Sequence, residues 1–68
     1  MKEIRKIVKS VPRTSGSSNP AFIQEEDGSI IIRVCTPNYA LRIIEALRSN
    51  GYDSNLASQY SGTAVYVR

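Results

Sequence analysis

The sequence contains no histidine and no tryptophan, and its 68 residues include a single cysteine, Cys35. One cysteine cannot form an intramolecular disulfide, which excludes the class of small secreted domains framed by disulfides. Histidine is the commonest metal ligand and the commonest general base. Neither a cysteine pair at metal-binding spacing nor a glycine-rich phosphate loop takes its place. We therefore expect a protein that is not an enzyme and that holds no metal and no cofactor.

Long apolar runs are also missing. No run of aliphatic residues is longer than Ile30–Ile32, far short of the roughly 20 residues that a membrane span needs. The charged start of the chain, Met1–Lys6, leads into no hydrophobic signal segment. We expect a cytoplasmic protein, in a cell or in an infected cell, that has no membrane partner.

The length and the charge of the chain limit its number of domains and its possible partners. We assign residues 1–68 to a single domain, and a domain this small has only a few kcal/mol of net stability. Its formal net charge is +3, but the positive charge is concentrated in residues 1–13, which balance to +4, while residues 14–68 balance to −1. A local basic segment suits an anionic partner such as nucleic acid, although solvated basic segments without a partner are equally common. Its basic residues are Lys2, Arg5, Lys6, Lys9 and Arg13.

Residues 1–12 carry conflicting signals. Ile4, Ile7, Val8 and Val11 have the i, i+3, i+4, i+7 spacing of a helix. All four are β-branched, and β-branched residues favour strands. We predict a strand here, ended by Pro12.

An Asp27-Gly28 dipeptide between two apolar runs predicts a hairpin, because such turns need glycine at a positive φ. A two-residue loop would pair Glu25 with Ile30, Ile23 with Ile32, and Ala21 with Val34. Paired residues share a face of the sheet. The predicted core face therefore holds Ala21, Ile23, Ile30, Ile32 and Val34, and the other face holds Phe22, Gln24, Ile31, Arg33 and Cys35.

The signals for a helix are strongest over residues 37–50. Thr36 suits the N-cap, Pro37 suits the first helical position, and Gly51 suits the left-handed residue that follows a helix. An apolar stripe lies between these signals, formed by Ala40, Ile43, Ile44 and Leu47. We expect this to be the longest helix, with Leu47 buried against a sheet.

A second hairpin is predicted around Ser61-Gly62, with Leu56 opposite Val67 and Ser58 opposite Val65. Its other face would hold Ala57, Gln59, Ala64, Tyr66 and Arg68. The predicted fold class is thus α+β: a small, mostly antiparallel sheet formed in the order strand, hairpin, helix, hairpin, with one helix packed on one face.

One helix covers only one face, so the opposite face would expose Phe22, Ile31, Arg33, Tyr66 and Arg68. Aromatic rings interleaved with arginines on an open sheet can stack bases and hold the phosphates of single-stranded nucleic acid. The same residue types suit a protein interface. In the plainest alternative, the N-terminal segment or a twin subunit simply covers this face. Because apolar groups are predicted on both faces, we expect a two-fold homodimer.

Two functions from different classes remain open at this stage. The first, slightly favoured by the regional charge, is a nucleic-acid-binding accessory or regulatory protein. The second is a protein-binding regulator or inhibitor of the size that viruses and mobile elements encode, docking through a strand edge or the same sheet face. The acidic turn Glu25–Asp27, the thiol of Cys35 and the polar loop around Gly16 are more simply a solvated turn, an inert side chain and a connector.

Overall fold

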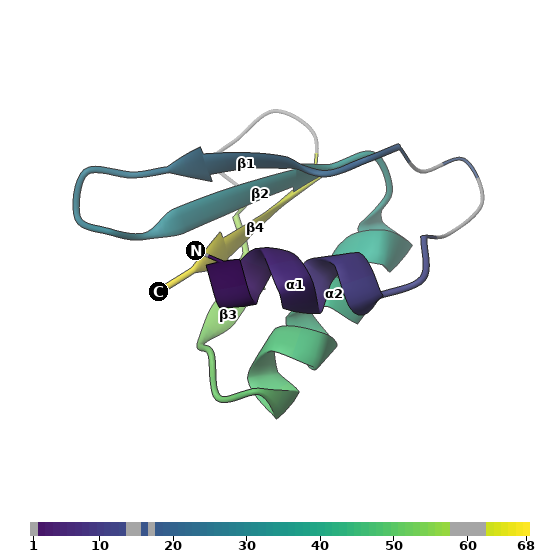
Figure 1. Ribbon diagram of the computed structural model, residues 1–68. Coiled ribbons are helices and arrows are strands. Elements are labelled where there is room, and N and C mark those ends of the chain that lie inside the picture. Colours follow the sequence, from purple (N-terminus) through teal and green to yellow (C-terminus); the bar gives the residue numbers. More distant parts are fainter. Residues whose placement is uncertain (1, 14–15, 17, 58–62) are drawn as a thin grey trace.

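A computed structural model describes residues 2–13, 16, 18–57 and 63–68. These residues form two helices and four strands, in the chain order α1 (Lys2–Ser10), β1 (Ala21–Gln24), β2 (Ile30–Val34), α2 (Pro37–Ser49), β3 (Ser54–Leu56) and β4 (Thr63–Val67). The strands make one sheet in the order β1-β2-β4-β3, and each neighbouring pair is antiparallel. Both helices lie on the same side of the sheet (Figure 1). The predicted α+β class is confirmed, with two helices in place of the expected one.

The helix α2 forms where its capping signals predicted it. The Thr36 hydroxyl accepts a hydrogen bond from the backbone N–H of Tyr39 at 3.3 Å, and Pro37 opens the helix. At the other end Gly51 has φ +87°, and the N–H of Tyr52 reaches the carbonyl of Leu47 at 3.0 Å. This pattern closes a helix on a left-handed glycine. The last helical residue is Ser49, one residue before the predicted end.

The predicted strand at residues 1–12 is wrong, because residues 2–10 form the helix α1. The helical spacing noted in the sequence puts Ile4 and Val8 on one side of α1, where both are buried in the core. Helix and strand propensities differ by only about 1 kcal/mol. Burial of two large aliphatic side chains against α2 and the sheet outweighs that difference.

The core lies between the two helices and the inner face of the sheet. From α2 it takes Ile43 and Leu47, and from β4 it takes Val65; all three are fully buried. Leu47 is therefore buried against the sheet side of the domain, as predicted, and α2 is the longest helix among the described residues. No helix in that part of the chain is both long enough and apolar enough to cross a membrane.

The first hairpin is one residue out of the predicted register. The N–H of Glu25 bonds the carbonyl of Ser29 at 2.6 Å, so the loop has three residues, and Gly28 takes φ +86° at its end. A three-residue loop of this kind uses glycine at its last position. The observed pairs are Ala21 with Arg33, Phe22 with Ile32, Ile23 with Ile31, and Gln24 with Ile30.

That shift exchanges the two faces of β1. Phe22 packs against the main core under the helices, whereas Ile23, predicted to be a core residue, is 39% exposed. The faces of β2 are as predicted, because Ile30 and Ile32 belong to the main core and Ile31 lies on the opposite face.

The second hairpin is displaced by two residues. Leu56 pairs with Val65 rather than with Val67, and Val67 pairs with Ser54. A shift of two leaves each side chain on its predicted face, but Leu56 is 51% exposed at the edge of the sheet. Ser58, Gln59 and the predicted turn at Ser61-Gly62 lie outside the described residues.

Candidate functional site

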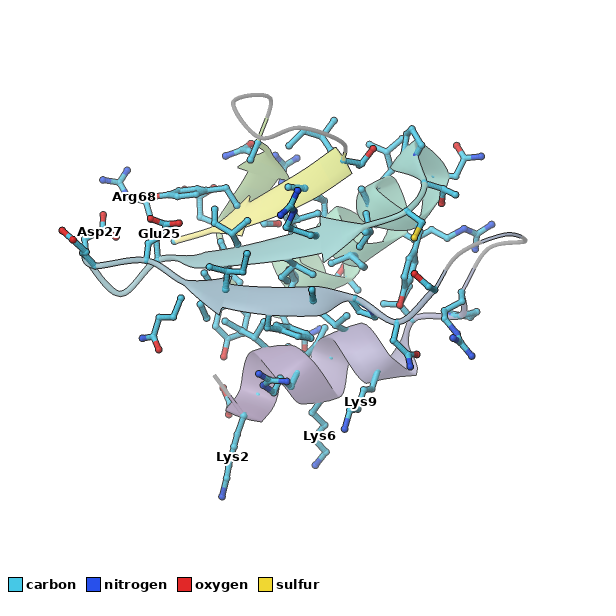
Figure 2. The ribbon with its side chains drawn as sticks, turned by 90° about the horizontal axis from the view of Figure 1, so that it is seen from above. Lys2, Lys6, Lys9, Glu25, Asp27 and Arg68 are labelled. Atoms are coloured by element: carbon cyan, nitrogen blue, oxygen red, sulfur yellow. The ribbon has the colours of Figure 1, made fainter. Side chains whose placement is uncertain are left out.

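Three lysines form a single stripe along α1. Lys2, Lys6 and Lys9 are spaced i, i+4, i+7, which brings side chains to one side of a helix with 3.6 residues per turn. All three are exposed, and their side chains point away from the sheet (Figure 2). We call these residues the lysine stripe. Had this segment been the predicted strand, alternation would have put Lys9 on the face opposite to Lys2 and Lys6.

The lysine stripe is held outward by the other side of α1. Ile4 and Val8, across the helix from the lysines, are 5% and 0% exposed. Rotation of the helix about its axis would pull these two side chains out of the core, at a cost of about 1.5–3 kcal/mol each. Within the described ranges, the side chains of Lys2, Lys6 and Lys9 form no hydrogen bond or ion pair. The stripe is therefore positioned by the fold, and its charges are free to contact an anion.

Glu3, the one acidic residue of α1, is occupied by a bond to the body of the protein. The Tyr52 hydroxyl, just after α2, donates a hydrogen bond to the Glu3 carboxylate. This hydrogen bond raises the pKa of Tyr52 above its ordinary value of 10.0, because ionised Tyr52 could not donate it and would meet a second negative charge. The bond ties the first turn of α1 to the end of α2.

Arg5 has a different role from the lysines. Its guanidinium carbon lies 4.4 Å from the centroid of the Phe22 ring, a cation–π contact between α1 and β1. The sequence predicted Arg5 as a phosphate contact and Phe22 as a stacking residue on the open face. The structure instead brings the two together on the helix side of the sheet.

Arg13 lies beyond the end of α1. Its Nη1 donates a hydrogen bond to Asn19 Oδ1 at 3.0 Å. Lys9 and Arg13 both border a hollow between the end of α1 and the segment that leads into β1. Of the five basic residues predicted to contact an anion, the structure thus groups three on one helix face and places Arg13 next to the last of them.

The open face of the sheet does not gather the five residues predicted for it. Ile31 is fully buried in a small second cluster with Ala57 and Ala64. Tyr66 packs against this cluster, half-buried, and its hydroxyl is 2.8 Å from the Ser29 hydroxyl. With Phe22 on the other face, the exposed members of the predicted set are Arg33 and Arg68.

The remaining polar groups are local. The exposed Cys35 thiol bonds the Ser18 hydroxyl, which lowers the pKa of Cys35. Asp27, in the β1–β2 turn, is bonded by the hydroxyl and the N–H of Ser29, and these bonds lower the pKa of Asp27. In the part of the chain that the structure describes, no three histidine, cysteine, aspartate or glutamate side chains are grouped closely enough to hold a metal ion.

No protein-family model, curated protein or solved structure matches this chain. Its function is therefore inferred from the chemistry of its own surface. The expected homodimer stays a prediction. The large apolar side chains exposed in the described residues, Ile23, Leu41 and Leu56, come from three different elements.

Proposed function

We propose that this protein binds nucleic acid through the lysine stripe of α1. The observation that carries the proposal is the combination of three free, exposed lysines on one face of a helix with an opposite face that is locked into the core. A helix already held in its binding orientation loses little conformational entropy when it meets a partner. Lysine ammonium groups contact phosphates as point charges, so the stripe supports recognition of a backbone rather than of base edges.

The length of the stripe matches a short stretch of phosphates. Lys2 and Lys9 are seven residues apart, which is about 10 Å along a helix. Each strand of B-form DNA carries one phosphate per roughly 3.4 Å of helix axis, so the stripe can contact about three phosphates. The logarithm of the binding constant should then fall against the logarithm of salt concentration with a slope of about −2 to −3.

The regional charge supports the same surface. Residues 14–68 balance to −1, so the positive field of the molecule comes from the segment that contains α1. A field localised in this way orients an approaching polyanion toward the helix. Contacts confined to the backbone favour weak binding with little sequence preference, with dissociation constants of about 10⁻⁴ to 10⁻⁶ M at physiological salt.

The test compares two charge-reversal variants by fluorescence anisotropy with labelled single- and double-stranded oligonucleotides. The first is Lys2→Glu with Lys6→Glu; Lys2 lies in the first turn of α1, where glutamate suits the helix dipole. The matched control is Arg42→Glu with Arg68→Glu, two exposed arginines on α2 and after β4. Each pair of substitutions lowers the formal net charge by four, from +3 to −1.

We expect the stripe variant to lose at least about tenfold in affinity and most of its salt dependence between about 50 and 200 mM salt. The control should stay within about threefold of the wild type, and circular dichroism should show both variants folded. Equal losses in the two variants would show that net charge alone drives binding and would remove the stripe from the proposal. If no oligonucleotide binds at low salt, the proposal fails, and a protein-binding regulator becomes the leading alternative.

A further inference from the structure

A hollow of about 340 Å³ lies where the chain leaves α1 and returns toward β1. Two cations border it, Lys9 from the last turn of α1 and Arg13 from the segment that follows. Much of the remaining lining is apolar and comes from Pro12, Pro20 and Tyr39. No acidic residue is present among the described residues that line it. The hollow therefore pairs a positive rim with an apolar wall.

The rim is partly pre-organised. One Nη group of Arg13 is held by Asn19 Oδ1 at 3.0 Å, which restrains the guanidinium at the edge of the hollow. A guanidinium has five N–H donors, and its planar fork matches the geometry of a phosphate. The bond to Asn19 uses one donor and leaves others for a ligand. Lys9 adds a second positive charge on the same hollow.

The wall suits a flat apolar group. Tyr39 is 2% exposed, so the core closes the bottom of the hollow, while Pro12 is exposed and Pro20 is half-exposed. Ligand pockets range from about 300 to 1,000 Å³. A hollow at the lower end of that range has room for one nucleotide and not for a longer segment. A nucleobase that is still paired within a duplex cannot enter the hollow.

We propose that this hollow binds one unpaired nucleotide, with the phosphate between Lys9 and Arg13 and the base against the proline wall. The inference rests on the proposed function, because Lys9 is also the last member of the lysine stripe, and it adds a preference within that function. Nucleic acid lying along α1 would place its unpaired end, or an unstacked nucleotide, in the hollow. Single strands and overhangs should therefore bind more tightly than blunt duplexes.

The experiment compares two hairpin oligonucleotides. The first has a blunt end, and the second is identical except for a one-nucleotide overhang at its 5′ or its 3′ end. We expect an overhang to bind about fivefold more tightly, or better. Arg13→Gln should abolish this difference while leaving the affinity for the blunt hairpin within about threefold. Arg42→Gln, which removes the same charge from α2, should preserve the difference.

An NMR titration with adenosine monophosphate identifies the site directly. The backbone signals of residues 9–13 and of Asn19 should shift with adenosine monophosphate more than with inorganic phosphate or adenosine alone, and these shifts should be lost in Arg13→Gln. If both hairpins bind equally and adenosine monophosphate shifts none of these signals, the hollow has no such role, although the proposed function stands. If neither hairpin binds, the proposed function itself fails.

Discussion

The two helices cover the same side of the sheet but differ in how many of their side chains they bury. From α2, five side chains are buried: Tyr39, Ala40, Ile43, Ile44 and Leu47. From α1, only Ile4 and Val8 are buried, and the rest of its surface is largely exposed and carries the lysine stripe. Viewed onto the sheet, α1 lies along the β1 edge (Figure 2). The helix at the centre of the core thus stabilises the fold, and the peripheral helix presents charge.

The largest effect expected from this division is on stability at α2. Leu47→Ala should lower the free energy of unfolding by about 2–5 kcal/mol, because it leaves a cavity at a fully buried position. Leu41→Ala is a matched control in the same helix. Leu41 is 53% exposed, so its truncation should change the stability by less than about 0.5 kcal/mol. Urea unfolding followed by circular dichroism measures the stability of both variants. Equal losses of stability would mean that α2 does not bury Leu47 in the core and expose Leu41.

A smaller loss is expected at α1. Val8 is fully buried, and Val8→Ala removes two carbons at about 0.8 kcal/mol each, so the loss should be about 1.5–2 kcal/mol. The same urea unfolding experiment compares it with Leu47→Ala. Val8→Ala removes two carbons and Leu47→Ala removes three, so the two losses are compared per carbon removed. An equal loss per carbon would contradict the contrast between a central and a peripheral helix.

The smallest effect concerns the bond that joins the two helices. Because the pKa of Tyr52 is raised in the folded protein, the hydrogen bond to Glu3 contributes its full stability below the ordinary tyrosine pKa of 10.0. That contribution is lost as the pH rises through the raised value. Tyr52→Phe should therefore be less stable than the wild type at neutral pH, and the difference should disappear at strongly alkaline pH.

Chemical denaturation of both proteins between neutral and strongly alkaline pH tests this. Tyr66→Phe is the control, since the Tyr66 hydroxyl pairs with the neutral hydroxyl of Ser29 rather than with a carboxylate. A Tyr52→Phe difference that stays constant over the whole range would show that the bond to Glu3 does not contribute.

The sequence predicted α2 correctly because its evidence is local. Thr36, Pro37 and Gly51 each suit one helix-terminal position, independently of the rest of the chain. The helix α1 was mispredicted because its two local signals, spacing and β-branching, conflict. The choice between them depends on the surface that Ile4 and Val8 meet, and that surface is built by residues far away in the sequence.

The candidate site was predicted in composition but not in arrangement. The sequence shows directly that residues 1–13 are basic. The lysine stripe, however, exists only if that segment is helical. The i, i+4, i+7 spacing of Lys2, Lys6 and Lys9 is the signal that could have revealed it, because it repeats the period of the apolar positions. The prediction that Phe22 lies on the open face of the sheet was wrong for another reason. An Asp-Gly dipeptide fits loops of two and of three residues, and only the longer loop puts Phe22 under Arg5.

That three-residue loop has a consequence for how the chain can change in evolution. Surface turns usually tolerate the gain or loss of a residue. Here, Glu25 and Ser29 flank the loop, so deletion of Glu26 would leave a two-residue loop of Asp27 and Gly28 between the same two residues and would keep the pairing of β1 with β2. Phe22 would then stay packed against the core and under the guanidinium of Arg5. The faces of β1 would be exchanged only if the full-length turn closed as a two-residue loop with Glu26 opposite Ser29. A substitution that favours the shorter loop would therefore act as a multiple substitution, and we expect the residues that favour the three-residue form to be kept more strictly than the length of the turn.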